Sequence, residues 1–181
     1  MALGDKVTGS VSSMFLDHCI ARYNKGKENN EFTRDSNVSM YSRKFRRAKD
    51  ISVLDDPIIK STIQTLMMQQ NELHYEFDLN DKMEIYIIEY TESSAGYVDW
   101  HCDFSGQELY DQSKGQQIKL SLSLMLNDAF TGGELEFDEG MQQLGKGEYL
   151  MFPSLWRHKV NTVVTGTRVA LVAWQYGPNW K

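Results

Sequence analysis

The period of the apolar residues changes near residue 75, and this change constrains the fold more than any other feature of the sequence. From there onwards, short runs rich in β-forming residues are separated by glycine-containing turns. The runs are YEFDL, KMEIYIIEY, IKLSLSLMLN, GELEF, GEYLMF, RHKVNTVV and TRVALVAWQY. Seven or more short strands with glycine turns are typical of an antiparallel sandwich or barrel, so we predict a mainly β core over about residues 76–178.

Before residue 75 the spacing is helical. Val11, Phe15 and Cys19 recur every four residues behind a serine-rich start, and in a second segment Asp56 suits an N-cap and Pro57 the first helical position. The apolar stripe of that second helix consists of Ile59, Ile63, Leu66 and Met67. We therefore expect helical support over about residues 1–75, with two helices that cover one outer face of the β core and a polar, irregular connection over residues 24–50.

The composition is that of one globular domain. The chain has 181 residues, of which 41% are hydrophobic and 24% charged, without a repeat or a long Pro/Gly/Ser linker. We expect a single domain over residues 1–181. The net charge of −6 argues against a nucleic-acid partner. The basic run RKFRRAK, Arg43–Lys49, is interpreted as a solvated loop, with a local basic patch as the alternative.

Two features predict a soluble, intracellular, cytoplasmic protein without a membrane partner. Cys19 and Cys102 are too few for a disulfide framework, which favours a reducing compartment. No apolar stretch approaches the roughly 20 residues of a membrane span, and the N-terminus lacks the apolar region of a signal peptide.

The strand IKLSLSLMLN has two unlike faces. One carries five aliphatic side chains, and the other carries Lys119, Ser121, Ser123 and Met125. In a half-exposed sheet the serine face would meet water. If the sheet lines a polar pocket instead, the serines point inward and the leucines pack on the helices.

Four residues suggest a metal site beside an anion site. His101 and Asp103 form an H-x-D pair, His158 begins a later strand, and Arg168 leads an otherwise apolar strand. A bare H-x-D pair could be a polar pair beside a loop, and a lone arginine could be an edge residue. Together, two imidazoles and one carboxylate match the facial triad of non-haem Fe(II) oxygenases, which leaves positions for a chelating 2-oxo acid and dioxygen. The planar fork of arginine suits the distal carboxylate of such an acid.

Over about residues 52–178 the chain resembles the prolyl 4-hydroxylase-like branch of the Fe(II)/2-oxoglutarate dioxygenases. The matching segments are YEFDL, IIEYTESSAGYVDWHCD, LSLMLNDAFTGGELEF and GKGEYLMFPSLWRHKVNTVVTGTRVALVAW. The most specific part runs from FTGGEL through FPS and HKV to GTRVA. The resemblance implies a double-stranded β-helix, which is a jelly roll related to the cupins, with N-terminal helices packed on the major sheet. This agrees with the strand pattern and the two helices.

The resemblance also implies roles for individual residues. His101, Asp103 and His158 match the iron ligands, and Arg168 matches the residue that binds the distal carboxylate of 2-oxoglutarate. Tyr90 lies where the family often has a tyrosine that contacts the same co-substrate.

The chain departs from the family at Met125, where many members have a tyrosine. Ser121 or Ser123, on the same strand face, could replace its hydrogen bond to the distal carboxylate, and Ser123 is our candidate. The candidate substrate-binding residues are Trp174, which matches an aromatic near the site entrance, and Trp100 and Trp156, which flank ligands; packing in the sheet is the alternative for these two.

The activity that the resemblance implies is hydroxylation by Fe(II), 2-oxoglutarate and O2, with release of succinate and CO2 and with ascorbate as a candidate reductant. The favoured substrate is a proline in a protein or peptide. Hydroxylation of a free amino acid or other small molecule is the alternative within enzymes, and a non-catalytic jelly-roll metal-binding module is the alternative from another class. The polar segment Phe104–Gln117 could close over the substrate or be a plain surface connection.

Overall fold

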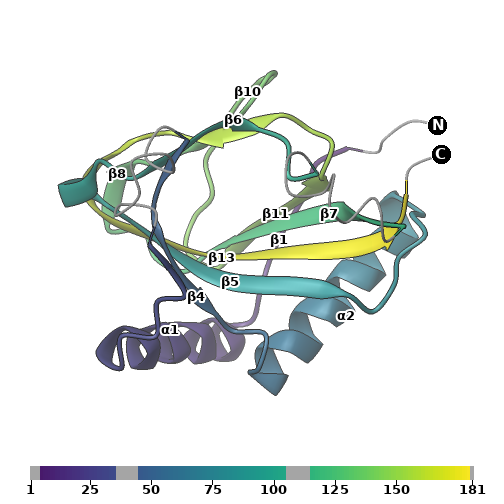
Figure 1. Cartoon of the computed structure of the whole chain (residues 1–181), viewed down its shortest axis with the longest axis horizontal. Helices are drawn as coiled ribbons and strands as arrows, with labels where there is room; N and C mark the ends of the chain where they lie inside the picture. Colours follow the sequence, from purple (N-terminus) through teal and green to yellow (C-terminus); the bar gives the residue numbers. More distant parts are fainter. Residues whose placement is uncertain (1–4, 36–44, 105–114, 180–181) are drawn as a thin grey trace.

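Two antiparallel sheets face each other and enclose the interior of the protein (Figure 1). The computed structural model describes residues 5–35, 45–104 and 115–179. Within these residues the larger sheet has eight strands and the smaller has five, and we call them the major and minor sheets. This arrangement confirms the predicted mainly β, double-stranded β-helix fold.

The strands of the two sheets come from distant parts of the chain. The major sheet has the order β1-β11-β7-β13-β5-β4-β2, with β8 paired to β13; its strands are β1 (Val7–Ser10), β11 (Glu148–Pro153), β7 (Gln116–Met125), β13 (Val163–Pro178), β5 (Met83–Thr91), β4 (Lys49–Ser52), β2 (Arg34–Asp35) and β8 (Phe130–Gly132). The minor sheet has the order β10-β9-β12-β6-β3; its strands are β10 (Gly140–Gln142), β9 (Leu135–Phe137), β12 (His158–Val160), β6 (Tyr97–His101) and β3 (Arg46–Arg47). A short 3-10 turn, η2 (Glu92–Ser94), joins β5 to β6.

Two helices lie against the outer face of the major sheet, as the sequence predicts (Figure 1). Helix α1 (Ser13–Glu28) begins after Ser12, whose hydroxyl accepts the N–H of Phe15. Helix α2 (Pro57–His74) begins after Asp56, whose carboxylate accepts two backbone N–H groups of the first turn, and Pro57 occupies the first turn. Neither helix combines the length and the apolar character that crossing a membrane would require.

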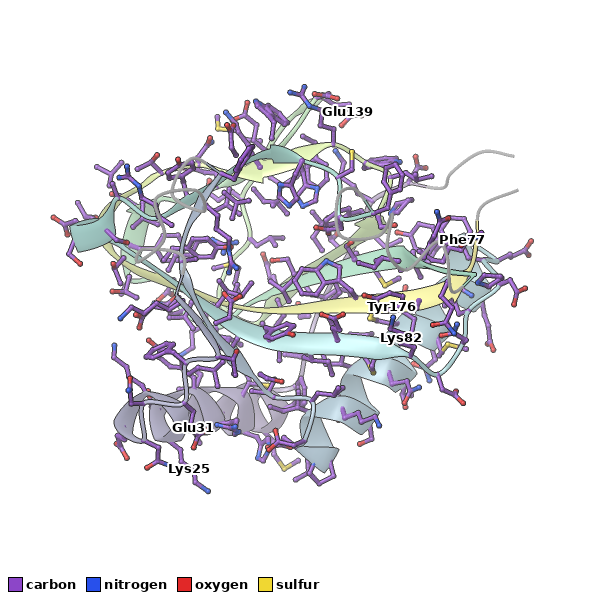
Figure 2. The ribbon with its side chains drawn as sticks, in the orientation of Figure 1. Lys25, Glu31, Phe77, Lys82, Glu139 and Tyr176 are labelled. Atoms are coloured by element: carbon purple, nitrogen blue, oxygen red, sulfur yellow. The ribbon has the colours of Figure 1, made fainter. Side chains whose placement is uncertain are left out.

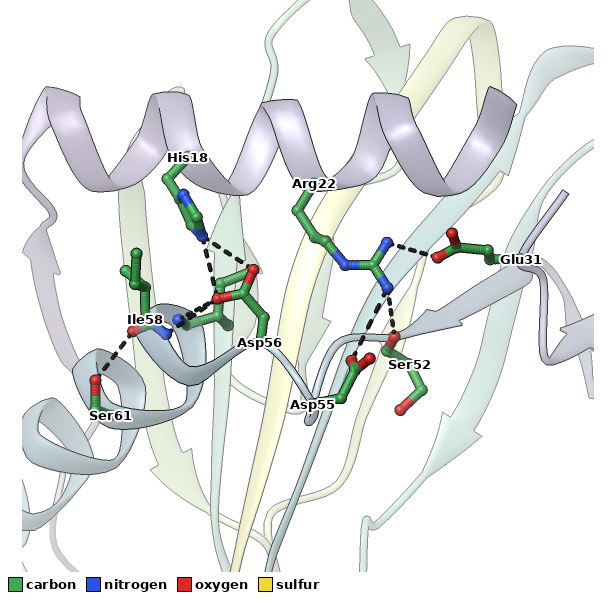
Figure 3. A network of polar contacts seen from close by, with 9 residues as sticks. His18, Arg22, Glu31, Ser52, Asp55, Asp56, Ile58 and Ser61 are labelled. Carbon is green, nitrogen blue, oxygen red and sulfur yellow. Dashed lines mark hydrogen bonds and ion pairs between the residues drawn. The ribbon is translucent and has the colours of Figure 1, made fainter. Parts of the chain in front are cut away.

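A polar network joins the two helices (Figure 3). His18 on α1 contacts both carboxylate oxygens of Asp56, at 3.0 and 3.1 Å, so the residue that caps α2 also anchors α1. One turn further along α1, Arg22 forms an ion pair with Glu31 at 2.7 Å and donates to the carbonyl of Ser52 at 3.4 Å. His18 therefore has a structural role between the two helices.

The major sheet separates two apolar clusters. Between the sheet and the helices, Leu120, Leu122 and Leu124 of β7 pack with Ile59 and Ile63 of α2, all fully buried. The other cluster, between the two sheets, includes Ile88, Leu150 and Phe152 from the major sheet and Leu135, Phe137 and Val160 from the minor sheet. The leucine face of β7 thus packs toward the helices and the serine face points into the interior. Of the two orientations that the sequence left open, the structure has the one that lines a pocket.

The N-terminal part differs from the prediction because it also contains strands. Strand β1 pairs with β11, and β3 and β4 begin within the basic run, so residues 24–50 are not entirely irregular. These strands are only two to four residues long, which is too short for a clear alternation of apolar and polar residues.

The predicted strand YEFDL is wrong. The side chain of Asn71 exchanges two hydrogen bonds with the backbone of Phe77, both 3.0 Å long, and Glu76 has a positive φ of 54°. These residues therefore form a turn that ends α2. Phe77 lies at the same end of the major sheet as Tyr176 and Lys82, whose ammonium group is 3.8 Å from the Tyr176 ring centre (Figure 2).

Candidate metal centre

The two predicted histidine ligands lie side by side in the minor sheet. His101 is the last residue of β6 and His158 the first of β12, and the antiparallel pairing of these strands makes the two residues direct partners. Their ring centres are 4.3 Å apart. Residues that are distant in sequence are thus brought together by the register of one strand pair.

Backbone carbonyls orient both imidazole rings. The Nδ1 atom of His101 is 2.7 Å from the carbonyl oxygen of Asp99, and Nδ1 of His158 is 3.0 Å from that of Trp156. Since a carbonyl only accepts hydrogen bonds, each Nδ1 carries a proton, and in the neutral form of each ring Nε2 then presents a lone pair. Neutral imidazoles in this tautomer are suited to bind a metal through Nε2.

Asp103 completes the cluster from the turn after β6, and not from the strand itself. One carboxylate oxygen is 3.3 Å from Nε2 of His101 and the other is 3.7 Å from Nε2 of His158. The second oxygen also accepts a 2.5 Å hydrogen bond from the hydroxyl of Ser121 on β7. The three residues offer ligand atoms that all lie within 4.8 Å of one another. This donor set fits a divalent transition metal such as Fe(II).

The electrostatics keep Asp103 ionised. Burial raises the pKa of its carboxyl, but at the acidic pH where a carboxyl titrates both histidines are protonated. Their charges, with the hydrogen bonds of His101 and Ser121, outweigh burial and hold the pKa of Asp103 well below its usual range. Burial lowers the pKa of His158, whose side chain is only 6% exposed, so this imidazole is neutral at pH 7. The site therefore presents a carboxylate and a neutral imidazole to a metal, as ligands must be deprotonated.

The cluster lies in a cavity of about 480 Å³ between the two sheets, which also contains Arg168 and Tyr90. Arg168 on β13 is the register partner of Tyr90 on β5, and its guanidinium lies 5.1 Å from the tyrosine ring centre. Arg168 is only 2% exposed, and its Nε has no hydrogen-bond partner within the described residues. A buried cation with an unpaired donor is suited to bind an anion.

A glycine allows Arg168 to take this position. Gly133 has a φ of +69°, and a Cβ atom added to it would lie 2.9 Å from Cδ of Arg168. Both the backbone conformation and the close approach favour glycine here. This explains in physical terms the second glycine of the FTGGEL segment.

The two serines that the sequence put forward both line the cavity, but they differ in their contacts. The hydroxyl of Ser121 is bonded to Asp103, which leaves Ser123 as the candidate for the co-substrate. Met125 lines a neighbouring hollow of about 430 Å³, which shares Leu135 and Arg168 with the cavity.

The three tryptophans predicted to bind substrate do not all lie in the cavity. Trp174 and Trp100 line the cavity, and the indole N–H of Trp174 is buried and has no partner among the described residues. The cations of Arg157 and Lys159 lie 4.6 and 4.9 Å from the Trp100 ring centre. Trp156 is not in the cavity lining and contacts the Phe137 ring at 6.3 Å.

Sequence reasoning missed one pair in the cavity wall. Arg46, within the basic run interpreted as a solvated loop, is held by two hydrogen bonds to the carboxylate of Asp50, which is 1% exposed. The only sequence signal for Arg46 was the basic run that contains it, and a basic run does not show where its side chains point. Residues 105–114, the greater part of the polar segment Phe104–Gln117, lie outside the described residues.

Several curated proteins are similar in sequence. A PKHD-type hydroxylase of a Psychrobacter species is 38% identical over 80 residues, which is 41% of this chain and 31% of that protein. Another, of a Synechococcus species, is 33% identical over 102 residues, which is 54% of this chain and 44% of that protein. The chain thus spans less than half the length of these two relatives. No protein-family model matches the sequence.

Solved structures share the fold over nearly the whole chain. A Pseudomonas putida prolyl 4-hydroxylase has a TM-score of 0.73 at 16% identity, covering 96% of this chain and 93% of that one. A Trichoplax adhaerens prolyl hydroxylase, in complex with a peptide fragment of hypoxia inducible factor, has a TM-score of 0.74 at 15% identity, covering 97% and 84%. The chain is thus similar in part of its sequence to PKHD-type hydroxylases, and it shares its fold with prolyl hydroxylases and carries a His–Asp–His cluster.

Proposed function

We propose that this protein is an Fe(II)- and 2-oxoglutarate-dependent dioxygenase that hydroxylates a proline in a protein or peptide. The reaction converts dioxygen, 2-oxoglutarate and a substrate C–H group into CO2, succinate and a hydroxylated substrate. One oxygen atom enters succinate and the other enters the new hydroxyl group.

One observation carries this proposal: a metal-binding triad and an unpaired, buried arginine share a single cavity. A structural metal site is normally closed by four protein ligands, and it needs no anion-binding residue beside it. Three ligands leave open positions, and a guanidinium inside the same cavity suits the far carboxylate of a chelating dicarboxylate. This combination favours an oxygenase over a non-catalytic jelly-roll module.

The residues of the chain have separate tasks in the proposed reaction. His101, Asp103 and His158 would hold the metal, and Ser121 keeps the Asp103 carboxylate in a fixed orientation through its 2.5 Å hydrogen bond. Arg168 would pair the distal carboxylate of 2-oxoglutarate, with Tyr90 beside it. A bound ferrous ion would supply the activation of dioxygen.

The proposal also names the substrate, a prolyl residue. It is supported by the similarity to hydroxylases and by the fold shared with prolyl hydroxylases, one of which was solved with a peptide. The apolar and aromatic part of the cavity wall, with Trp174, Val172 and Val98, suits the ring of a proline.

The test is an assay of the purified protein with Fe(II), 2-oxoglutarate, ascorbate and proline-containing peptides. We expect succinate to form in proportion to peptides that gain the mass of one oxygen atom, and His158→Ala to abolish both products. Free proline and other amino acids form the parallel arm. Oxygen gain in a free amino acid alone would move the substrate to the small-molecule class, and iron binding without succinate under every condition would leave a non-catalytic module.

A further inference from the structure

The metal cavity contains a second arginine, Arg46, whose chemistry differs from that of Arg168. Arg46 lies on β3 at the edge of the minor sheet, and Asp50 lies on β4 of the major sheet, so their ion pair bridges the two sheets. Asp50 accepts from both Nη atoms, through a 2.7 Å bond from Nη1 and a second bond from Nη2. Arg46 itself is 22% exposed at the side chain and lines the cavity.

The guanidinium-bearing residues Arg46 and Arg168 line the same cavity. Burial raises the pKa of the Tyr90 hydroxyl, and the positive charges of Arg46 and Arg168 both oppose that rise. Arg46 also lines the cavity together with Trp100 and Asp99 of β6. It is therefore near the metal cluster, on the side of the cavity wall formed by β3 and β6.

The charges of the two arginines are compensated differently. Asp50 neutralises Arg46, whereas Arg168 has no carboxylate within 4 Å among the described residues. A carboxylate ligand therefore gains more from Arg168 than from Arg46. The bonds to Asp50 still leave N–H groups of Arg46 for another acceptor, since a guanidinium has five. A compensated donor of this kind is suited to a neutral oxygen such as a peptide carbonyl.

We propose that Arg46, held by Asp50, is a specificity residue that donates a hydrogen bond to a backbone carbonyl of a peptide substrate at the metal cavity. The inference rests on the proposed function and extends it, because it selects peptides over free amino acids. The α-carboxylate of a free amino acid would need an uncompensated cation. Among the described residues of the cavity lining, Arg168 is the arginine whose charge no neighbouring carboxylate neutralises. The carboxylate of the co-substrate would bind to this arginine.

The test compares substrate binding with co-substrate binding in matched variants. Arg46→Gln removes the charge, and the double variant Arg46→Gln/Asp50→Asn also removes the carboxylate that the single change would leave buried without the Arg46 cation. Arg47→Gln is the control, because Arg47 is the neighbouring residue, lies over the Tyr97 ring at 5.6 Å and is not in the cavity lining. The probe is a pool of pentapeptides with blocked termini and a central proline, and free proline serves as the small-molecule arm.

We expect the KM for the peptides to rise about tenfold or more in the double variant, as for the loss of a hydrogen bond to a charged group. The KM for 2-oxoglutarate should change less than twofold, and Arg47→Gln should match wild type. Calorimetry with the protein loaded with Mn(II) and 2-oxoglutarate measures peptide binding in the absence of turnover. The peptide affinity of the double variant should fall by a similar factor to the rise in KM. An unchanged peptide KM and affinity would overturn the role of Arg46, as would a wild-type preference for free proline. Absence of 2-oxoglutarate turnover in wild type would instead refute the proposed function.

Discussion

Replacing Arg168 by methionine should weaken co-substrate binding and leave the ligand-free protein at least as stable as wild type. Arg168 is 2% exposed, and its Nε has no hydrogen-bond partner among the described residues. Burial lowers the pKa of Arg168, and the nearby Tyr90 and Glu134 only partly oppose this effect. The group thus carries a desolvation cost that a bound dicarboxylate would offset.

The expected change in folding free energy is the difference between two terms. An unpaired buried donor costs about 1–3 kcal/mol. The contact of the guanidinium with the Tyr90 ring, at 5.1 Å, returns about 0.5–2 kcal/mol. Methionine fills a similar volume without a polar group, so we expect a gain of about 1 kcal/mol. This corresponds to a melting temperature roughly 2–4 °C higher for a chain of this size.

Co-substrate binding should change in the opposite direction. Leaving a buried carboxylate without its cation costs about 2–5 kcal/mol. This raises the KM for 2-oxoglutarate by about thirtyfold or more, since roughly 1.4 kcal/mol is tenfold. Saturating 2-oxoglutarate should restore much of the turnover, which is the kinetic result of lost uniform binding. Arg168→Lys keeps the charge without the fork, so its defect should be intermediate.

Thermal melts with and without Mn(II) and 2-oxoglutarate, together with succinate release at increasing 2-oxoglutarate, measure both effects. His158→Ala is the control that no concentration of co-substrate should rescue, since it removes a metal ligand. A ligand-free Arg168→Met protein that melts more than about 5 °C below wild type, and is still stabilised by 2-oxoglutarate as wild type is, would refute the reasoning.

Three further predictions follow from other parts of the structure. Asp103→Ala should bind Fe(II) or Mn(II) far more weakly but remain folded, because the two apolar clusters and not the metal hold the sheets together. Metal titration measures the affinity, and circular dichroism measures the folded state. Ser121→Ala should lower metal affinity by about 10–100-fold, since it removes the 2.5 Å bond that orients Asp103, and calorimetry with Mn(II) would detect this. Burial raises the pKa of Asp56, but the hydrogen bonds that its carboxylate accepts from Ile59 and His18 outweigh burial, so the pKa is lowered. The ionised carboxylate therefore stabilises the fold above pH about 4, and this stabilisation is lost as the pH falls further. Chemical denaturation from pH 7 to 3 should therefore show a difference between wild type and Asp56→Asn that disappears at the acid end.

The sequence predicted those parts of the protein that local patterns determine. The cap at Asp56 and the stripe of Ile59, Ile63, Leu66 and Met67 were sufficient to place α2. Three of these apolar residues are buried, and Leu66 is partly buried against the same cluster. The alternation of β7 correctly divided its side chains into two faces, although only the structure shows which face meets the helices. His101 was found through the H-x-D pair and His158 through the strand that it begins.

Specific side-chain pairings were not predictable in the same way. Asn71 turns the chain at Phe77 through side-chain bonds that no propensity encodes, so a strand-like run became a turn. Arg46 was placed in a solvated loop because its run is basic, yet a buried carboxylate four residues later holds it in the cavity wall. In both cases a specific polar partner outweighed the composition of the segment.

The distribution of charge in the cavity connects the two arginines with the order of binding. A ferrous ion, the Asp103 carboxylate and the Arg168 guanidinium would together carry two net positive charges, and 2-oxoglutarate brings two negative ones. These groups would thus balance one another only after the co-substrate has bound, with Arg46 already paired to Asp50; Asp99, which also lines the cavity, is exposed to solvent. Before that point an anionic substrate could compete for Arg168 and the metal, whereas afterwards a neutral peptide meets no unpaired charge. The same compensation that makes Arg46 a poor site for a carboxylate thus favours binding of 2-oxoglutarate first and the peptide second.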